Sequence, residues 1–429
     1  MLRKVMSVGL ICLFLVGVIS CGGKIEPTPT GGVSPTTSKE EKPAVSESKT
    51  VTPKPTEPKA QAGKIIFERQ ENFYNLYIIN ADGTNEIEIE RGGREVKMDD
   101  PTLKKSVNTV TKISDITPSP DGRKVVYQIT YQAMPPYKHE VWYDLYLVNI
   151  DGTGKTKMES SARGARKVCW SPDSKIVSYV TGRSALNKGR FVLFNTDTGE
   201  REEVMDYPTY SKADYQWSPD SSKILIQYGE EGWRIRTIEG DELKLEAVMS
   251  SMPVRWSADG KKIFYMEKPQ GNLVSINPDG TDKTRIIPAS INKQFKFVNV
   301  TSEKILYQTQ PSNIYPSLWV SDLDGNNHEM VISDMEDLFV GEKKIMAVSN
   351  PILGERATFV VILKTIEKTE IHYDNPRTTL FSPDEEWLVD TDKDQWGDWY
   401  LYIMNLNTMR KIEITEPSKY SIQVYAWVP

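Results

Sequence analysis

The stretch WSPDSKIVS, from Trp170 to Ser178, contains the signals that decide the fold of this chain. Ser-Pro-Asp fits a tight turn, because proline fixes φ at the second position and aspartate suits the third. The apolar triplet that follows Lys175 has the composition of a buried β-strand. The aromatic residue ahead of the turn is expected to pack in the interface between two neighbouring sheets. The stretch therefore predicts a strand, a tight turn and a second strand.

The basic residue and its apolar triplet recur along the chain. The copies are Lys64–Phe67, Lys124–Tyr127, Lys175–Ser178, Lys223–Ile226, Lys262–Tyr265, Lys304–Tyr307, Lys344–Ala347 and, with an acid in place of the base, Glu386–Val389. Their spacings are 60, 51, 48, 39, 42, 40 and 42 residues. A period of about 40–50 residues built from short strands is typical of a β-propeller.

Two kinds of turn accompany the triplets. Ser-Pro-Asp turns or close variants precede them at Pro118–Gly122, Trp170–Asp173, Trp217–Asp220, Trp256–Gly260 and Phe381–Asp384. Asp-Gly turns, a strong hairpin signal, end the segments Leu76–Thr84, Leu145–Thr153, Leu273–Thr281 and Leu318–Gly325. Each unit is therefore predicted to contain four strands, A to D, with the first turn joining A to B and the Asp-Gly turn joining C to D.

These repeats resemble the WD40-like (PD40-type) repeats of TolB-type propellers, which also occur in the non-catalytic domain of prolyl-oligopeptidase-type enzymes. The resemblance covers residues 64–429 and is specific in units two to five and eight. It is faint in unit seven, Asp334–His372, which has neither turn motif. The resemblance implies an all-β propeller of four-stranded blades.

The two ends of the repeat region predict how the ring closes. Unit one begins at its B strand, Lys64, and the chain finishes with an A-like strand, Ser421–Pro429. We expect this C-terminal strand to complete the first blade and to remove a sheet edge. Residues 64–429 divided by eight give about 46 residues per blade, in the propeller range. The sequence predicts eight blades, with seven as the next alternative; six is usual in TolB-type proteins.

The first twenty residues have the pattern of a secretory signal. Arg3 and Lys4 precede an apolar run, Val8–Ile19, that is short for a membrane span. The run ends in Val-Ile-Ser-Cys at Cys21, which resembles the lipobox of bacterial lipoproteins. That resemblance implies that residues 1–20 are removed and that Cys21 carries the lipid. The alternative is an ordinary signal peptide with an incidental cysteine.

Residues 21–63 are predicted to be a disordered tether. The segment 22–63 contains seven Pro, seven Thr and no aromatic residue, so it cannot bury enough apolar surface to offset its ordering entropy. We expect the body to be held near a membrane yet free to reorient. No Asp follows Cys21, which favours the outer membrane in a two-membrane bacterium. The predicted location is the cell envelope: the periplasmic face of that membrane, or the cell surface of a one-membrane host.

Composition excludes several classes of function. The 429 residues include 53 basic and 59 acidic ones, for a net charge of −6. An acidic chain without a basic block argues against nucleic acid as the main partner. Three cysteines cannot form a disulfide scaffold. The three histidines fit no metal-ligand motif, and no nucleophile elbow, Walker loop or dinucleotide fingerprint occurs. We therefore assign no catalytic residue and no required cofactor.

One acidic cluster raises the alternative of a calcium site. Asp390, Asp392, Asp394 and Asp398 stand at positions 1, 3, 5 and 9 of a segment that resembles the calcium loops of other propellers. Gln395 replaces the glycine of that loop, and Lys393 adds a positive charge. The competing interpretation, which we favour, is an ordinary turn between strands B and C.

Two insertions point to a docking surface. The D–A connection between units one and two, 91–112, and the B–C loop of unit two, 131–143, are long and should rise side by side. Aromatic residues gather in this loop and in other B–C loops, and they form a candidate binding rim: Tyr131, Tyr137, Trp142, Tyr315 and Trp396. The alternative is that these rings pack the longer loops, as Trp142 and Trp399 are expected to do.

The sequence thus predicts a lipid-anchored, monomeric envelope propeller that serves as a non-catalytic binding scaffold for a protein, peptide or glycan. The first alternative is a polysaccharide-active lyase or hydrolase with a carboxylate site in the central funnel, a role that some TolB-like propellers have. A second alternative is a factor that exchanges partners as TolB does, but segment 22–63 is too polar to fold as the N-terminal domain of TolB.

Overall fold

The computed structural model describes residues 63–100, 103–137, 139–161, 164–182, 189–207, 214–228, 231–248, 252–289, 295–309, 315–350, 357–371 and 379–429. The predicted signal, Cys21 and all of the tether except Gly63 lie outside the described residues. No helix within the described ranges is both long and apolar enough to cross a membrane. The regular elements of these ranges are all β-strands.

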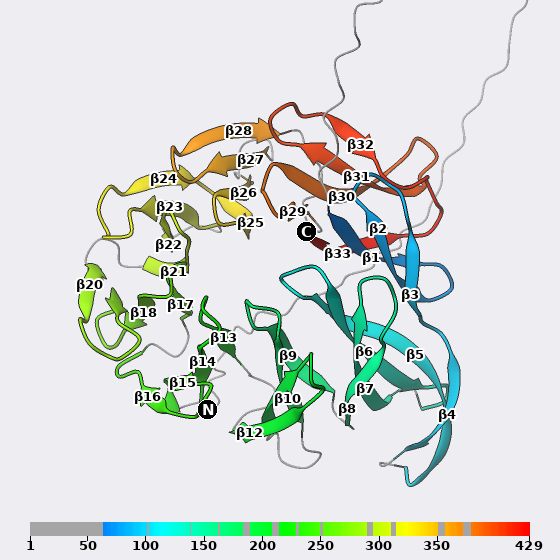
Figure 1. The fold of residues 1–429 in the computed structure, drawn as a ribbon. Coiled ribbons are helices and arrows are strands. Elements are labelled where there is room, and N and C mark those ends of the chain that lie inside the picture. The colour runs from blue at the N-terminus through cyan, green and yellow to red at the C-terminus, as the bar shows by residue number, and fades with distance from the viewer. Residues whose placement is uncertain are drawn as a thin grey trace, which may run out of the picture. The chain divides into compact units, whose positions relative to one another are not determined.

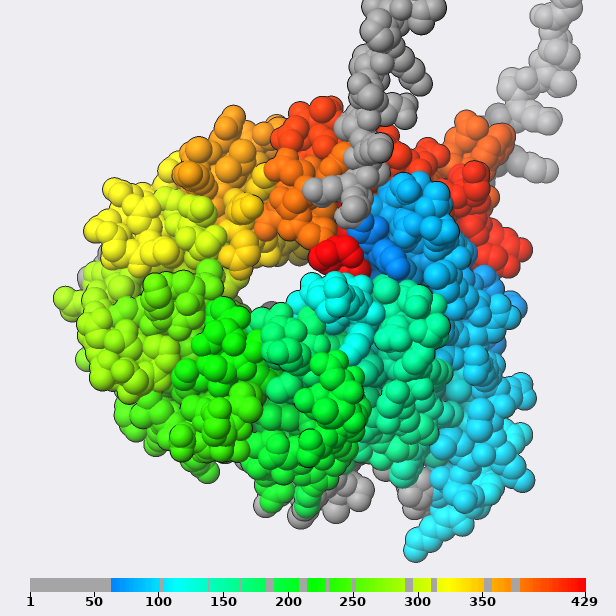
Figure 2. Space-filling view, viewed as in Figure 1, coloured from blue at the N-terminus to red at the C-terminus, as the bar shows by residue number. Residues whose placement is uncertain are grey.

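The strands form eight antiparallel sheets, which follow one another in chain order around a ring (Figure 1). Seven sheets have four strands and one has five. The eight-bladed propeller predicted from the repeat is therefore confirmed. The space-filling view shows a hollow at the centre of the ring (Figure 2).

The blades are made of the following strands. Blade 1 contains β33 (Ile422–Val428), β1 (Lys64–Gln70), β2 (Tyr74–Asn80) and β3 (Ile87–Arg91); blade 2 contains β4 (Glu95–Asp100), β5 (Lys105–Pro118), β6 (Lys124–Ala133), β7 (Glu140–Asn149) and β8 (Thr156–Ser161); blade 3 contains β9 (Ala165–Trp170), β10 (Ile176–Gly182), β11 (Gly189–Asn195) and β12 (Arg201–Tyr207). Blade 4 contains β13 (Tyr215–Trp217), β14 (Lys223–Gln227), β15 (Trp233–Thr237) and β16 (Glu242–Lys244); blade 5 contains β17 (Val254–Trp256), β18 (Ile263–Glu267), β19 (Asn272–Ile276) and β20 (Thr284–Ile287); blade 6 contains β21 (Phe295–Val300), β22 (Ile305–Thr309), β23 (Ser317–Ser321) and β24 (Glu329–Ile332). Blade 7 contains β25 (Met335–Val340), β26 (Lys344–Ser349), β27 (Ala357–Ile362) and β28 (Glu367–Ile371); blade 8 contains β29 (Leu380–Phe381), β30 (Trp387–Lys393), β31 (Trp399–Asn405) and β32 (Lys411–Glu413).

The C-terminal strand closes the ring. β33 pairs with β1 from Lys64 opposite Val428 to Arg69 opposite Ile422, with one bulge between Ile66 and Phe67. The last strand of the chain thus becomes the A strand of the first blade, as predicted. Unit seven, the doubtful unit of the sequence, also forms a complete blade, β25–β28, without either turn motif.

The core consists of one apolar cluster at each boundary between neighbouring blades. Alternate residues of a B strand serve different clusters: Ile65 and Phe67 pack against blade 8, whereas Ile66 packs against blade 2. A strand buried on both faces requires apolar residues at consecutive positions, which explains the repeated triplet. The cluster between blades 8 and 1 is built like the others and contains Trp427 of β33.

The Ser-Pro-Asp turns are stabilised by the same hydrogen bonds in each copy. In blade 3 the Ser171 hydroxyl donates to Asp173 (2.6 Å) and accepts from the backbone N–H of Ile176 (2.9 Å). The preceding tryptophan, Trp170, donates its indole N–H to the carbonyl of Thr117 in blade 2. The aromatic residue ahead of the turn therefore connects adjacent blades, as predicted.

The residue after the turn aspartate has a positive φ and, in three copies, links neighbouring blades. Its φ is 62° at Ser174 and Ser221 and 60° at Glu385, where other copies have glycine. The hydroxyls of Ser174 and Ser221 accept from backbone N–H groups of the preceding blade. The buried carboxylate of Glu385 accepts from three successive N–H groups of blade 7, those of residues 342, 343 and 344, at 2.6, 2.9 and 2.7 Å.

Glu385→Ala is expected to lower the free energy of unfolding by about 2 kcal/mol, because charged hydrogen bonds to backbone groups are lost at the boundary of blades 7 and 8. Urea unfolding of the full chain measures this. Glu239→Ala, at an exposed position, is the control and should have little effect. Glu385→Gly removes the carboxylate but relieves the positive φ. If the Glu385→Gly variant were more stable than the natural chain, the proposed role of the carboxylate would be contradicted.

Candidate functional site

Blade 2 departs from the repeat by an extension that we define as β4, the first half of β5 (105–110) and the β6–β7 loop. β4 pairs with β5 from Glu95 opposite Val110 to Asp100 opposite Lys105. The same half of β5 pairs with the end of β6, where Thr109 lies opposite Ala133. The two insertions singled out in the sequence thus lie side by side, as predicted. In Figure 1 this cyan hairpin extends away from the ring.

The extension has an interior of its own. Val107, Ala133 and Val141 are buried together, and Met98, Leu103 and Trp142 pack against them. The buried carboxylate of Asp100 contacts Nε2 of His139 at 2.5 Å and accepts from the backbone N–H of Leu103 at 3.0 Å. These contacts join the D–A insertion to the B–C loop, so the extension is held together by its own side-chain contacts. We call its surface the platform.

A cavity of about 500 Å³ opens on this platform. Its charged side chains are Lys97 and Lys105, and its polar ones are Ser106 and Asn108. Apolar and aromatic surface comes from the β6–β7 loop: Met134, Pro135 and Tyr137. The ammonium of Lys105 lies 4.5 Å from the ring centre of Tyr137 and donates to its hydroxyl. No described Asp or Glu lines this cavity.

Two of the predicted rim residues, Tyr131 and Trp142, are half-buried and hydrogen-bonded within blade 2. Tyr131 is half-buried, and its hydroxyl donates to Asp144 at 3.0 Å. The indole N–H of Trp142 donates to the Ser160 hydroxyl, which in turn donates to Asp144. Burial, and then Asp144, raise the pKa of Tyr131. Both rings therefore have structural partners, and we do not include them in the docking surface.

The other rim residues lie apart from one another. Tyr137 is 40% exposed and lines the cavity of the extension. Trp396 is 81% exposed at the tip of the turn between β30 and β31. Tyr315 is half-buried ahead of β23. Tyr137 and Trp396 both stand on B–C loops, which share one face of a propeller.

The four aspartates of the calcium alternative are spread over a strand and its turn. Asp390 is 1% exposed, accepts from the Thr379 hydroxyl at 2.8 Å, and has a pKa that burial raises to about 7. Asp392 is paired with Lys411. The carboxylate of Asp394 accepts from the N–H groups of Trp396 and Asp398, as in a tight turn. Among the described residues, no group of three His, Cys, Asp or Glu could hold a metal ion, so calcium binding stays a prediction without a ligand set.

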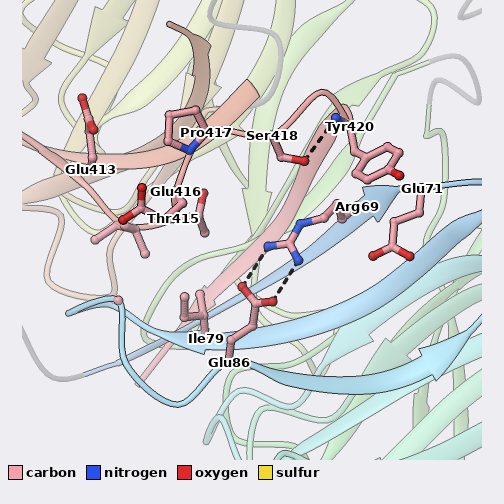
Figure 3. A pocket seen from close by; sticks show the side chains of 12 residues that line it. Arg69, Glu71, Ile79, Glu86, Glu413, Thr415, Glu416, Pro417, Ser418 and Tyr420 are labelled. Atoms are coloured by element: carbon pink, nitrogen blue, oxygen red, sulfur yellow. Dashed lines mark hydrogen bonds and ion pairs between the residues drawn. The ribbon is translucent and has the colours of Figure 1, made fainter. Parts of the chain in front are cut away.

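Another cavity, about 720 Å³, lies at the seam between blades 8 and 1 (Figure 3). Arg69 forms a bidentate ion pair with Glu86 at 2.9 and 2.8 Å, drawn in Figure 3. The Arg69 guanidinium also lies 4.8 Å from the ring centre of Tyr77. Glu71, Glu413 and Glu416 complete its charged lining. Its arginine is already paired with Glu86, so the described lining of this cavity offers no free cation.

A third cavity, about 510 Å³, is lined by the inner strands β25, β29 and β33. Two buried carboxyl groups contact its lining hydroxyls: Asp390 contacts Thr379, and Glu68 accepts from Tyr425 at 2.6 Å. Burial raises the pKa of Glu68 to about 7, against the hydrogen bond from Tyr425 and the charge of Lys112. Glu68 is 4% exposed, and neither carboxyl group lines the cavity itself.

Sequence reasoning missed Lys97, Lys105, Glu68 and Glu385. The two lysines belong to the insertion 91–112, which was recognised by its length, but nothing in the local pattern distinguishes them from solvated lysines. Glu385 had a signal, because an acid occupies a position that holds glycine or serine in other copies. Glu68 follows its triplet directly, and its burial depends on β33, which lies more than 350 residues away in the chain.

Comparison with known proteins concerns structure alone, since no protein-family model and no curated protein matches this sequence. Dipeptidyl peptidase 4 of Porphyromonas gingivalis is similar at 12% identity and a TM-score of 0.52, over 84% of this chain and 60% of that one. A prolyl endopeptidase is similar at 14% identity and a TM-score of 0.51, over 81% of this chain and 54% of that one. TolB from Acinetobacter baumannii shares 13% identity over 74% of this chain and 83% of that one, with a TM-score of 0.34.

This chain spans less than two thirds of the length of the two peptidases, and identities of this size transfer no activity. What these similarities show is the fold alone, which this structure builds as a β-propeller of eight antiparallel sheets.

Proposed function

We propose that the protein is a lipid-anchored module of the cell envelope that binds a partner through the extension of blade 2 and performs no catalysis itself. The observation that carries this proposal is the extension, which has a hydrophobic cluster of its own and a contact between the buried Asp100 and His139; the described residues of the four-stranded blades contain no such addition. Such a structure on a loop face positions side chains for binding rather than completing the ring. The anchor rests on the lipobox resemblance of Cys21.

An affinity capture from detergent-solubilised envelope, with the full chain as bait, tests this function. We expect a partner that is retained by the natural chain and reduced several-fold by Tyr137→Ala, because the exposed ring of Tyr137 lines the platform cavity. Trp396→Ala on the same face tests whether the contact extends to blade 8. Met330→Ala is the matched control, since Met330 is an equally exposed apolar residue (45%) on an outer strand, β24.

Cys21→Ser should release the chain from the membrane fraction and leave capture of the partner unchanged. A partner that is unaffected by Tyr137→Ala and by Trp396→Ala, or the absence of any specific partner, would contradict the proposed docking surface.

The enzyme alternative requires carboxyl groups that reach a substrate. Glu68 and Asp390 have the raised pKa values expected of acid catalysts, but both are buried behind hydroxyl groups of the inner cavity. The alternative of a polysaccharide-active enzyme stays a prediction, and a binding function has the stronger support.

A further inference from the structure

We propose that the cavity on the blade 2 extension binds an anionic saccharide, with the ammonium groups of Lys97 and Lys105 as the anion-binding groups and Tyr137 as the surface for a sugar ring. This inference rests on the proposed binding function and specifies its ligand. Three features of the cavity support it: two ammonium groups without a carboxylate partner among the described residues, a tyrosine ring, and polar side chains that can hydrogen-bond to sugar hydroxyls.

The charge of the cavity is positive, although the Lys105 ammonium already contacts Tyr137. Neither Lys97 nor Lys105 forms an ion pair with a carboxylate of the described residues, and no described acid lines the cavity. Three other lysines of the same blade are paired with carboxylates: Lys124 with Asp197, Lys155 with Glu90 and Lys157 with Asp144. In a chain with a net charge of −6, two ammonium groups in one concavity, neither with a carboxylate partner among the described residues, favour an anionic ligand.

The remaining lining suits a sugar. Tyr137 is partly exposed, and Met134 and Pro135 lie beside it in the same cavity. Together they offer an apolar surface to the C–H face of a pyranose ring. Asn108 lies directly opposite Lys97 across the β4–β5 pair, and its amide can both donate to and accept from sugar hydroxyls. The cavity of about 500 Å³ is within the usual size of ligand sites.

The acidic residues near the cavity disfavour a long, densely charged polyanion as its ligand. Glu95 and Asp99 project from the same strand as Lys97, and Asp99 accepts a hydrogen bond from Ser106 at the margin of the cavity. These carboxylates would repel a nucleic acid or a highly phosphorylated chain. A short saccharide that carries separated carboxylates, such as a uronic-acid oligomer, avoids this repulsion and places a single anion near the lysines.

The experiment compares two oligosaccharides that differ only in charge. A short uronic-acid oligosaccharide and the neutral product of its carboxyl reduction are titrated into the full chain by isothermal calorimetry. We expect the acidic form to bind, with an affinity that falls as salt increases, and the reduced form to bind at least about tenfold more weakly. Sulfated and phosphorylated oligosaccharides identify which anion the site prefers.

Three variants locate the site. Lys97→Gln and Lys105→Gln should each weaken binding of the acidic oligosaccharide about tenfold. Tyr137→Ala should weaken binding of the acidic oligosaccharide and also any residual binding of the reduced one. Lys368→Gln, an exposed lysine on β28 of blade 7, makes the same change of charge elsewhere and should leave affinity unchanged.

Equal binding of the acidic and reduced forms, equal loss with Lys368→Gln, or no binding of any acidic oligosaccharide would overturn the inference. In the last case, a protein partner captured from the envelope and lost with Tyr137→Ala would leave the proposed function standing while the saccharide ligand fails.

Discussion

A chain that ends at Tyr420, and so lacks β33, is expected to lose its closed ring. Ile422, Val424, Trp427 and Val428 are all buried, and burial of large apolar side chains stabilises by roughly 1.5–3 kcal/mol each. Their combined loss, roughly 6–12 kcal/mol, is comparable with the total stability of a typical domain. β1 would also become an exposed edge strand.

Urea unfolding and small-angle scattering would detect this result as a strongly lowered midpoint and a larger radius of gyration. A synthetic peptide of residues 421–429 added to the shortened chain should pair with β1 and restore compactness, whereas a scrambled peptide should not. Unchanged midpoint and radius after the truncation would show that the ring is held closed without β33.

Stability is expected to fall as pH rises from about 4.5 to about 7, and Glu68→Gln should remove a large part of this fall. Burial raises the pKa of Glu68 from 4.5 to about 7, so within this window the unfolded chain releases a proton that the folded chain keeps. Each pH unit then costs about 1.4 kcal/mol of folding free energy. The total is about 3 kcal/mol, reached by pH 7 and constant above it.

At pH 8 the Glu68→Gln variant should therefore be more stable than the natural chain by about 3 kcal/mol, whereas below pH 4 the two should be nearly equal. Urea midpoints measured from pH 4 to pH 9 give the comparison, with Glu239→Gln, at an exposed position, as the control. Asp390, whose pKa burial also raises to about 7, keeps part of the pH dependence in the variant. Parallel curves for the variant and the natural chain would contradict the raised pKa of Glu68.

The fold could be predicted because its main determinants are local and repeated. The triplets at Lys175 and its equivalents are apolar at successive positions because both faces of each B strand are buried, and the turn residues fix where each strand ends. Unit seven lacked the turn motifs, yet its blade forms because the clusters on both sides bury residues such as Ile345 and Met346. In blade 7, packing against the neighbouring blades specifies the fold where the local turn motifs are missing.

The site was less predictable because it depends on side-chain orientation and on distant contacts. Tyr131 and Trp142 stand in an aromatic loop by sequence, but in the structure they lie opposite each other on β6 and β7. Tyr131 donates to Asp144 directly, and Trp142 reaches it through Ser160. The cavity residues Lys105 and Tyr137 are 32 positions apart. Only the pairing of β4, β5 and β6 brings them together, and no local pattern specifies that pairing.

The closing strand gives the molecule a circular order. Lys64 and Val428 lie opposite each other in one sheet, and the cluster beside that sheet is of the same kind as those between other blades. No blade is therefore first by structure, and blade 1 is the seam only because the backbone is interrupted there. If a short linker joined these two residues and the chain were opened between two other blades, the same eight sheets would be traversed in a permuted order, and the seam would move to the new opening.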